Sequence, residues 1–210
     1  MKLKACSFAC ALAFLFAIAG TTTCQAQSSN VTWQILPWYE DSNWGAFNGH
    51  PTLNFYGRLI FEGRAARAVQ TFTWPKTFTF DAVLEERQAD DGLLQLLFLA
   101  PGTPSNLVVQ TAITFNMIYR GAGNPSGNDE LAIQKVTDYN GTFLWETPFV
   151  VQSGTNYHVV VSISSTGVLS ARINGVQYAT NQSLSDNPFL LQVTGWQPMN
   201  RWTVRNFRVQ

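Results

Sequence analysis

A loop-like segment near the N-terminus, PWYEDSNWGAFNGHP at residues 37–51, combines large aromatic rings with carboxylates, amides and an imidazole. Its prolines and glycines interrupt any regular element, so a loop is predicted here. A sugar ring stacks its apolar face on an indole or phenol ring, while its hydroxyls pair with neighbouring polar groups. The segment is therefore predicted to contribute the ligand-binding residues Trp38, Tyr39, Glu40, Asp41, Trp44, Asn48 and His50.

Aromatic residues also fill protein cores, so part of this loop is expected to close the fold, with either Trp38 or Trp44 exposed for stacking. Two other stretches carry the same mixture of rings and polar groups: YNGTFLWE with Trp145, and GWQPMNRW with Trp196 and Asn200. These three residues are predicted to join the binding site. The aromatic residues assigned to the core are Trp33, Phe47, Phe55, Trp74, Trp202 and Phe207.

The beginning of the chain has the layout of a secretory signal peptide. Basic residues precede the apolar stretch 5–20, and small residues follow up to Ala26, where cleavage is predicted. The apolar run is shorter than the roughly 20 residues that a spanning helix needs. Lipid attachment at Cys24 is the less favoured alternative. We expect a secreted or periplasmic protein with a signal peptide at 1–26, one domain at 27–210 and no membrane span.

Composition narrows the classes of partner. The chain has 13 basic and 13 acidic residues, and neither sign forms a long run, so no nucleic-acid partner is expected. All three cysteines, Cys6, Cys10 and Cys24, lie in the predicted signal peptide. The mature domain is therefore expected to be stabilised by its hydrophobic core without disulfides.

Alternation of apolar and polar residues dominates from residue 53 onward. In TFTFDAVLEE, Phe78 and Phe80 fall on one face and Asp81 on the other, which predicts a half-buried strand. The stretches LVVQTAITFNMIYR and NYHVVVSISS repeat the pattern. Asn174-Gly175 predicts a tight hairpin turn, because both residues tolerate positive φ. About a dozen short strands without amphipathic helices predict an all-β fold of two packed antiparallel sheets.

Two C-terminal stretches, NYHVVVSISSTGVLSARINGVQYAT and NPFLLQVTGWQPMNRWTVRNFRVQ, resemble the paired and closing strands of concanavalin A-like and laminin-G-like jelly rolls. The resemblance implies an antiparallel β-sandwich of that superfamily. Its members include lectins, carbohydrate-binding modules, glycoside hydrolases and polysaccharide lyases, so the fold alone does not choose a function.

Glucanases of this superfamily carry the strand motif Glu-x-Asp-x-x-Glu, whose carboxylates perform retaining hydrolysis. The nearest stretch here is DAVLEE, where Asp81 replaces the first glutamate and Val83 stands at the middle acid. We interpret Asp81, Glu85 and Glu86 as surface acids of a strand, and His158 as a surface imidazole, since it shares its phase with polar Ser162.

No cofactor is expected, with calcium as the alternative. Asp90 with Asp91, or Asn128 with Asp129 and Glu130, offer hard oxygen ligands, but turn formation explains the same residues. The favoured function is a secreted lectin-like domain that binds carbohydrate by aromatic stacking and polar loop residues. A hydrolase or lyase acting on glycans and an adhesion module binding protein are the two alternatives. The catalytic residues of such an enzyme are not recognisable from the sequence.

Overall fold

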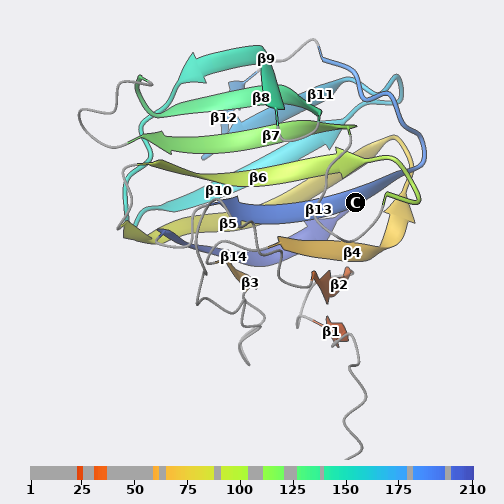
Figure 1. The fold of residues 1–210 in the computed structure, drawn as a ribbon, viewed down its shortest axis with the longest axis horizontal. Helices are drawn as coiled ribbons and strands as arrows, with labels where there is room; N and C mark the ends of the chain where they lie inside the picture. The colour runs from red at the N-terminus through yellow and green to blue at the C-terminus, as the bar shows by residue number, and fades with distance from the viewer. Residues whose placement is uncertain are drawn as a thin grey trace, which may run out of the picture.

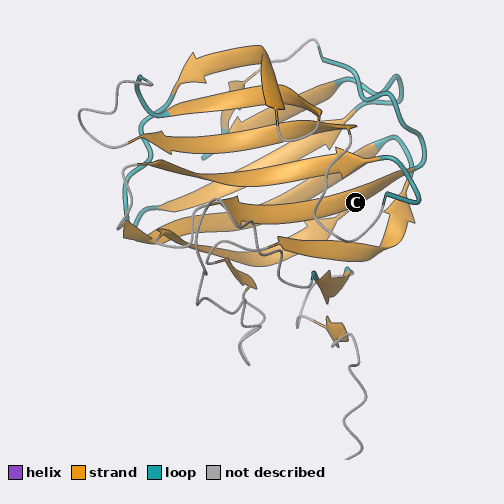
Figure 2. Ribbon diagram, in the orientation of Figure 1, coloured by secondary structure: helices purple, strands orange, loops and turns teal. Residues whose placement is uncertain are grey.

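The computed structural model describes residues 23–25, 31–36, 59–61, 65–87, 91–103, 111–120, 127–137, 140–178, 182–196 and 200–210. Every regular element in this part of the chain is a β-strand (Figure 2). Within the same residues, no helix could cross a lipid bilayer. The strands are β1 (Thr23–Gln25), β2 (Thr32–Ile35), β3 (Leu59–Phe61), β4 (Ala65–Phe72), β5 (Lys76–Arg87), β6 (Asp91–Leu99), β7 (Thr111–Arg120), β8 (Glu130–Thr137), β9 (Asn140–Pro148), β10 (Asn156–Ile163), β11 (Leu169–Ile173), β12 (Val176–Tyr178), β13 (Phe189–Trp196) and β14 (Asn200–Val209).

The strands form two antiparallel sheets that lie one behind the other in Figure 1. One sheet has eight strands in the order β1-β2-β4-β13-β6-β7-β8-β9, and the other has six in the order β12-β11-β10-β5-β14-β3. β13 and β14, which follow each other in sequence, lie in different sheets. The prediction of an all-β antiparallel sandwich is therefore confirmed.

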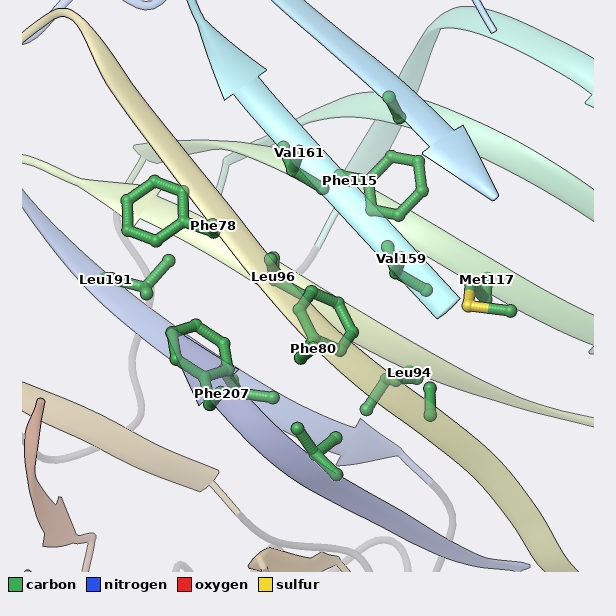
Figure 3. Close-up of a cluster of buried hydrophobic side chains, with 14 of the residues drawn as sticks. Phe78, Phe80, Leu94, Leu96, Phe115, Met117, Val159, Val161, Leu191 and Phe207 are labelled. Atoms are coloured by element: carbon green, nitrogen blue, oxygen red, sulfur yellow. The ribbon is translucent and has the colours of Figure 1, made fainter. Parts of the chain in front are cut away.

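The core lies between the two sheets and is rich in aromatic rings (Figure 3). On β5, Phe78 and Phe80 point inward and are fully buried, as the alternation of the strand predicts. Phe80 stacks on Phe207 with ring centroids 5.4 Å apart, and Phe207 also meets the edge of Trp33. Burial of each large apolar side chain contributes about 1.5–3 kcal/mol to folding, so rings from both sheets stabilise the sandwich. Trp202 is buried as predicted, whereas Trp74 is only partly buried.

The predicted hairpin between β11 and β12 is confirmed. Asn174 has a φ of 50° and Gly175 a φ of 82°, the combination that a tight two-residue turn requires. Ile173 pairs directly with Val176 across it. β4 begins at Ala65, so residues 65–69 of the stretch GRAARAV are part of a strand.

One expectation about strand burial is wrong. The alternation along β7 predicts one buried face, and Phe115 and Met117 do face the core. Its opposite face is also buried, including the polar side chains of Thr114 and Asn116. A strand pattern that reads as half-buried therefore belongs to a strand covered on both sides.

β1 lies in the predicted signal peptide and pairs with β2, with Cys24 opposite Trp33. Cleavage after Ala26 would remove this edge strand and leave β2 at the edge of the sheet. The signal peptide and the domain boundaries remain predictions.

Candidate ligand-binding face

The eight-stranded sheet carries a set of polar side chains on its outer face, the side away from the core. Residues that pair directly across antiparallel strands point to the same side of the sheet. Leu191 on β13, Leu96 on β6 and Phe115 on β7 face the core. The residues that alternate with them along each strand therefore face outward. These outward residues form two rows across the sheet. One row is Arg67, Gln192, Leu97, Thr114, Gln134 and Phe143, and the other is Thr194, Gln95, Asn116, Ala132 and Glu146. We call these two rows the polar face.

Several polar side chains of this face are removed from solvent. Arg67 is 5% exposed, Gln192 1%, and Thr114 and Asn116 0%. Among the described residues, the only other buried polar or charged residue is Thr203. Burying polar groups costs free energy unless they find partners, so such a cluster requires an organised network.

The first half of the network joins β4 to β13. Arg67 donates from Nε and Nη2 to Gln192 Oε1, over 3.1 and 2.9 Å, and from Nη1 to the carbonyl of Thr103 over 2.6 Å. Gln192 in turn donates to Thr194 Oγ1 over 3.3 Å. Desolvation by burial lowers the pKa of Arg67 from its ordinary value. A guanidinium remains charged at neutral pH, so this part of the face is cationic.

The second half joins β7 to β8. Asn116 donates from Nδ2 to Thr114 Oγ1 over 3.0 Å and to Gln134 Oε1 over 3.1 Å. Thr114 donates to the backbone carbonyl of Gln134 over 3.3 Å. The carbonyl oxygen Oδ1 of Asn116 is buried, and no described residue donates to it. An acceptor left in this state costs about 1–3 kcal/mol.

An exposed aromatic ring borders the polar face on β9. Phe143 pairs with Gln134 and is 42% exposed, one of the few large apolar side chains in the described residues to be so open. A β-bulge follows it, and Trp145 pairs with Ile133 and packs against the core. In a regular strand these two rings would share a face. The bulge therefore turns Trp145, which the sequence favours as a ligand contact, inward and leaves Phe143 outside.

The other predicted contacts are placed only in part. Trp38, Tyr39, Glu40, Asp41, Trp44, Asn48 and His50 lie outside the described residues, as do Phe47 and Phe55. Trp196 ends β13, where its backbone pairs with Leu93, and Asn200 begins β14 opposite Arg87. Their side chains are outside the described part of the structure. A ligand-binding role for these residues, and for Trp145, remains a prediction.

Two of the acids considered as calcium ligands, Asp129 and Glu130, have protein partners, whereas Asp90 and the side chain of Asp91 lie outside the described residues. Asp129 accepts hydrogen bonds from the backbone amides of Arg120, over 2.7 Å, and Val151, over 2.9 Å. Glu130 forms an ion pair with Arg120 at 2.7 Å, and burial raises its pKa even though the arginine opposes the shift. In the described residues, no three His, Cys, Asp or Glu side chains gather in a group that could hold a metal ion. The contacts of Asp129 tie the segment before β8 to the end of β7 and to the residues that follow β9.

The sequence matches no family model, and no curated protein is similar to it at the level of sequence. The structure does resemble solved structures. Carbohydrate-binding module CBM66 from Bacillus subtilis aligns with a TM-score of 0.60 and 11% identity, over 87% of this chain and 98% of the module. The carbohydrate recognition domain of Emp47p gives a TM-score of 0.58 at 12% identity, covering 82% of this chain and 85% of that domain.

A legume lectin-like domain from Entamoeba histolytica aligns over 76% of this chain and 86% of its own length, with a TM-score of 0.55 and 8% identity. At these identities the comparisons speak to the fold. Together with the two antiparallel sheets, they confirm the resemblance that the C-terminal strands indicate: the chain folds as a concanavalin A-like β-sandwich.

Proposed function

We propose that this protein binds carbohydrate, and that the polar face of the eight-stranded sheet is its binding surface. The observation that carries the proposal is the buried carbonyl oxygen of Asn116, which no described residue satisfies. It lies in a row with Gln95 and Thr194, and its own amide is fixed by Thr114 and Gln134. An acceptor held in place before the ligand arrives loses little conformational entropy on binding.

The surrounding side chains suit a sugar. Hydroxyl groups both donate and accept, and the face offers the Asn116 acceptor together with the amides of Gln95 and Gln134 and the hydroxyl of Thr194. Phe143 provides an apolar ring at the border of the same face, on which the C–H side of a sugar can stack. The solved structures with this fold include domains described as carbohydrate-binding, which supports the same assignment.

Loop residues and location belong to the same proposal. The predicted aromatic loop with Trp38 and Trp44 would add stacking contacts, since loops at the rim of a rigid scaffold commonly carry binding residues. Export by the predicted signal peptide would bring the domain to extracellular or periplasmic glycans.

The test is a glycan-array screen of the chain without residues 1–26, followed by calorimetric titration of the oligosaccharides that bind. We expect binding without any product, because the proposed role is recognition. Gln134→Ala, which removes the half-buried amide beside Asn116, should weaken binding by about tenfold or more. Gln152→Ala truncates an exposed glutamine between β9 and β10 that belongs to neither row and is the matched control. Absence of binding to every glycan, or equal affinities in the two variants, would refute the proposal.

A further inference from the structure

The outer face of the six-stranded sheet has a different chemistry, with arginines from separate strands gathered on it. On β11, Arg172 pairs with Val160, which pairs with Thr79 on β5, and Thr79 pairs with Arg208 on β14. Since neighbouring strands lie about 4.8 Å apart, three strand spacings separate Arg172 from Arg208 by roughly 14 Å. We call the surface around them the basic face.

The next row of the basic face is His158 on β10, Asp81 on β5 and Arg205 on β14. The inward neighbours of these residues, Phe80 and Val159, belong to the core, so this row also points outward. The basic face thus consists of Arg172, His158, Arg205 and Arg208 with one carboxylate, Asp81.

A β-bulge in β14 brings two of the arginines to the same side. The pairing of β14 with β5 shifts between Arg205 and Arg208, and Asn206 within the shift has a φ of 55°. Val204 and Phe207 remain in the core, so the inserted residue lets both arginines lie outside. Bulges of this kind re-aim side chains.

The one carboxylate in these two rows, Asp81, holds this arrangement together. Asp81 Oδ2 accepts a hydrogen bond from Asn206 Nδ2 over 2.7 Å, and its Oδ1 lies 2.8 Å from His158 Nδ1. Both oxygens are therefore engaged by residues other than the arginines. An asparagine backbone in the left-handed region costs free energy, and the hydrogen bond from the Asn206 side chain to a carboxylate helps to offset that cost.

The arginines themselves have neutral partners. Arg172 donates from Nε to Gln177 Oε1, and Arg205 donates from Nη2 to Asn156 Oδ1 over 3.2 Å. Arg208 is exposed. In the ranges that the structure describes, none of the three forms an ion pair with a carboxylate. The whole chain has a formal net charge of zero, so this concentration of cations on one face is a local asymmetry.

We infer that the basic face is a second binding surface, separate from the polar face, and that it takes an anionic polysaccharide carrying carboxylate or sulfate groups. Guanidinium groups match such planar or tetrahedral oxyanions through paired N–H donors. Asn156, Gln177 and Ser162 lie among them and can pair with sugar hydroxyls. A polymer that combines hydroxyls with anionic groups therefore fits the chemistry of this face.

Other polyanions fit less well. Proteins that hold single-stranded nucleic acid stack its bases on aromatic rings, and the described rows of the basic face contain none beyond the imidazole of His158. Stable attachment to a membrane requires apolar groups that insert into it. The exposed large apolar residues among those described, Val69, Phe143, Val150 and Val176, are absent from these rows.

The test uses alginate oligosaccharides, a polyuronate, as the probe, with neutral dextran as the comparison. By calorimetry at low salt, the triple variant Arg172→Gln, Arg205→Gln, Arg208→Gln should bind alginate at least about tenfold more weakly, as three roughly additive exposed ion pairs would. Arg208→Gln alone should cost about twofold to fivefold. Binding should also weaken as salt rises. Circular dichroism would verify that each variant is folded.

Lys135→Gln is the matched control, because it removes one exposed cation from β8 in the other sheet. It should leave alginate binding unchanged. If Lys135→Gln lost as much alginate affinity as Arg208→Gln, the attraction would be diffuse and the inference would be overturned. Unaltered binding in the triple variant, or tighter binding to a DNA duplex or to phosphatidylserine vesicles than to alginate, would also overturn it. Failure of the polar face to bind any neutral glycan would not affect these outcomes, so the two proposals are separable.

Discussion

The side-chain amide of Asn116 donates a hydrogen bond to Gln134 Oε1 over 3.1 Å, while its carbonyl oxygen stays buried without a donor from any described residue. This relationship fixes one end of the Asn116 amide and leaves its buried oxygen without a hydrogen-bond donor among the described residues. Three strands position Asn116, because on β7 it pairs with Gln95 of β6 on one side and with Ala132 of β8 on the other. A ligand hydroxyl that reached this oxygen would complete the network.

Asn116→Ala should therefore weaken the binding of whichever glycan the protein takes by about tenfold or more. The fold should survive, because the variant also removes the unsatisfied oxygen and so recovers part of the cost of the lost hydrogen bonds. Calorimetric titration together with urea unfolding would separate the two effects. Glycan affinity that stays at the level of the unmodified protein would mean that Asn116 does not contact the ligand.

Phe143→Ala should weaken glycan binding by about threefold to tenfold through loss of stacking, with little effect on stability, since the ring is 42% exposed. Trp145→Ala should show the opposite balance, because its ring packs against the core and its loss destabilises the sandwich. Val150→Ala removes another exposed apolar side chain and serves as the control. Thermal midpoints and affinities measured on all three decide the assignment, which fails if Phe143→Ala binds as tightly as Val150→Ala.

Gly167 should be the less replaceable of two glycines with nearly the same backbone. Gly167 and Gly154 have φ values of 79° and 76°, so alanine strains both, by about 1–2 kcal/mol. At Gly167 a Cβ would also lie 2.7 Å from the indole of Trp74, whereas at Gly154 it would meet nothing within 4 Å. Gly167→Ala should thus destabilise by roughly 1–3 kcal/mol more than Gly154→Ala in urea unfolding. Equal destabilisation would show that Trp74 does not pack on this glycine.

Asp81 should make the fold sensitive to acid. Burial alone would raise its pKa, but hydrogen bonds from His158 and Asn206, with the charges of His158 and Arg205, bring the pKa below its ordinary value. A carboxyl with a lowered pKa stabilises the folded state above its unfolded pKa, and that stability is lost as the pH falls through the folded pKa.

Since an unfolded aspartate titrates near pH 4, Asp81→Asn should reduce stability at neutral pH and flatten its decline below about pH 4. Thermal midpoints from pH 7 to pH 2.5 would measure this. The control is Asp186→Asn, which changes a carboxylate that accepts a bond from the adjacent Ser185. If the thermal midpoint of Asp81→Asn fell as steeply at low pH as that of the control, the result would contradict the network around Asp81.

Local sequence was enough to predict some elements and not others. The alternation in β5 and the Asn174-Gly175 turn depend on nearest neighbours, so both were predictable, as was the outward phase of His158. The polar face was not. Gln192 meets Arg67 across 125 residues of sequence, because β13 inserts between β4 and β6. In a single sequence, Thr114 and Asn116 look like the solvent side of a strand.

Bulges set a second limit on prediction. Phe143 and Trp145 are two residues apart, which predicts a shared face, and only the pairing of β9 with β8 separates them. The bulge at Asn206 likewise places Arg205 and Arg208 on one side of β14, although residues three apart in a regular strand point to opposite sides. Both shifts arise from contacts with a partner strand, so alternation along one strand does not reveal them.

The most direct test of the central claim is a nuclear magnetic resonance titration of the isotope-labelled domain with the tightest-binding neutral oligosaccharide from the array. We predict that chemical-shift changes concentrate on Thr194, Gln95, Asn116 and Gln134, on the outer face of β13, β6, β7 and β8. The side-chain amide of Asn116 should be among the groups most affected. Changes confined to β5, β10 and β14 of the other sheet would contradict the account.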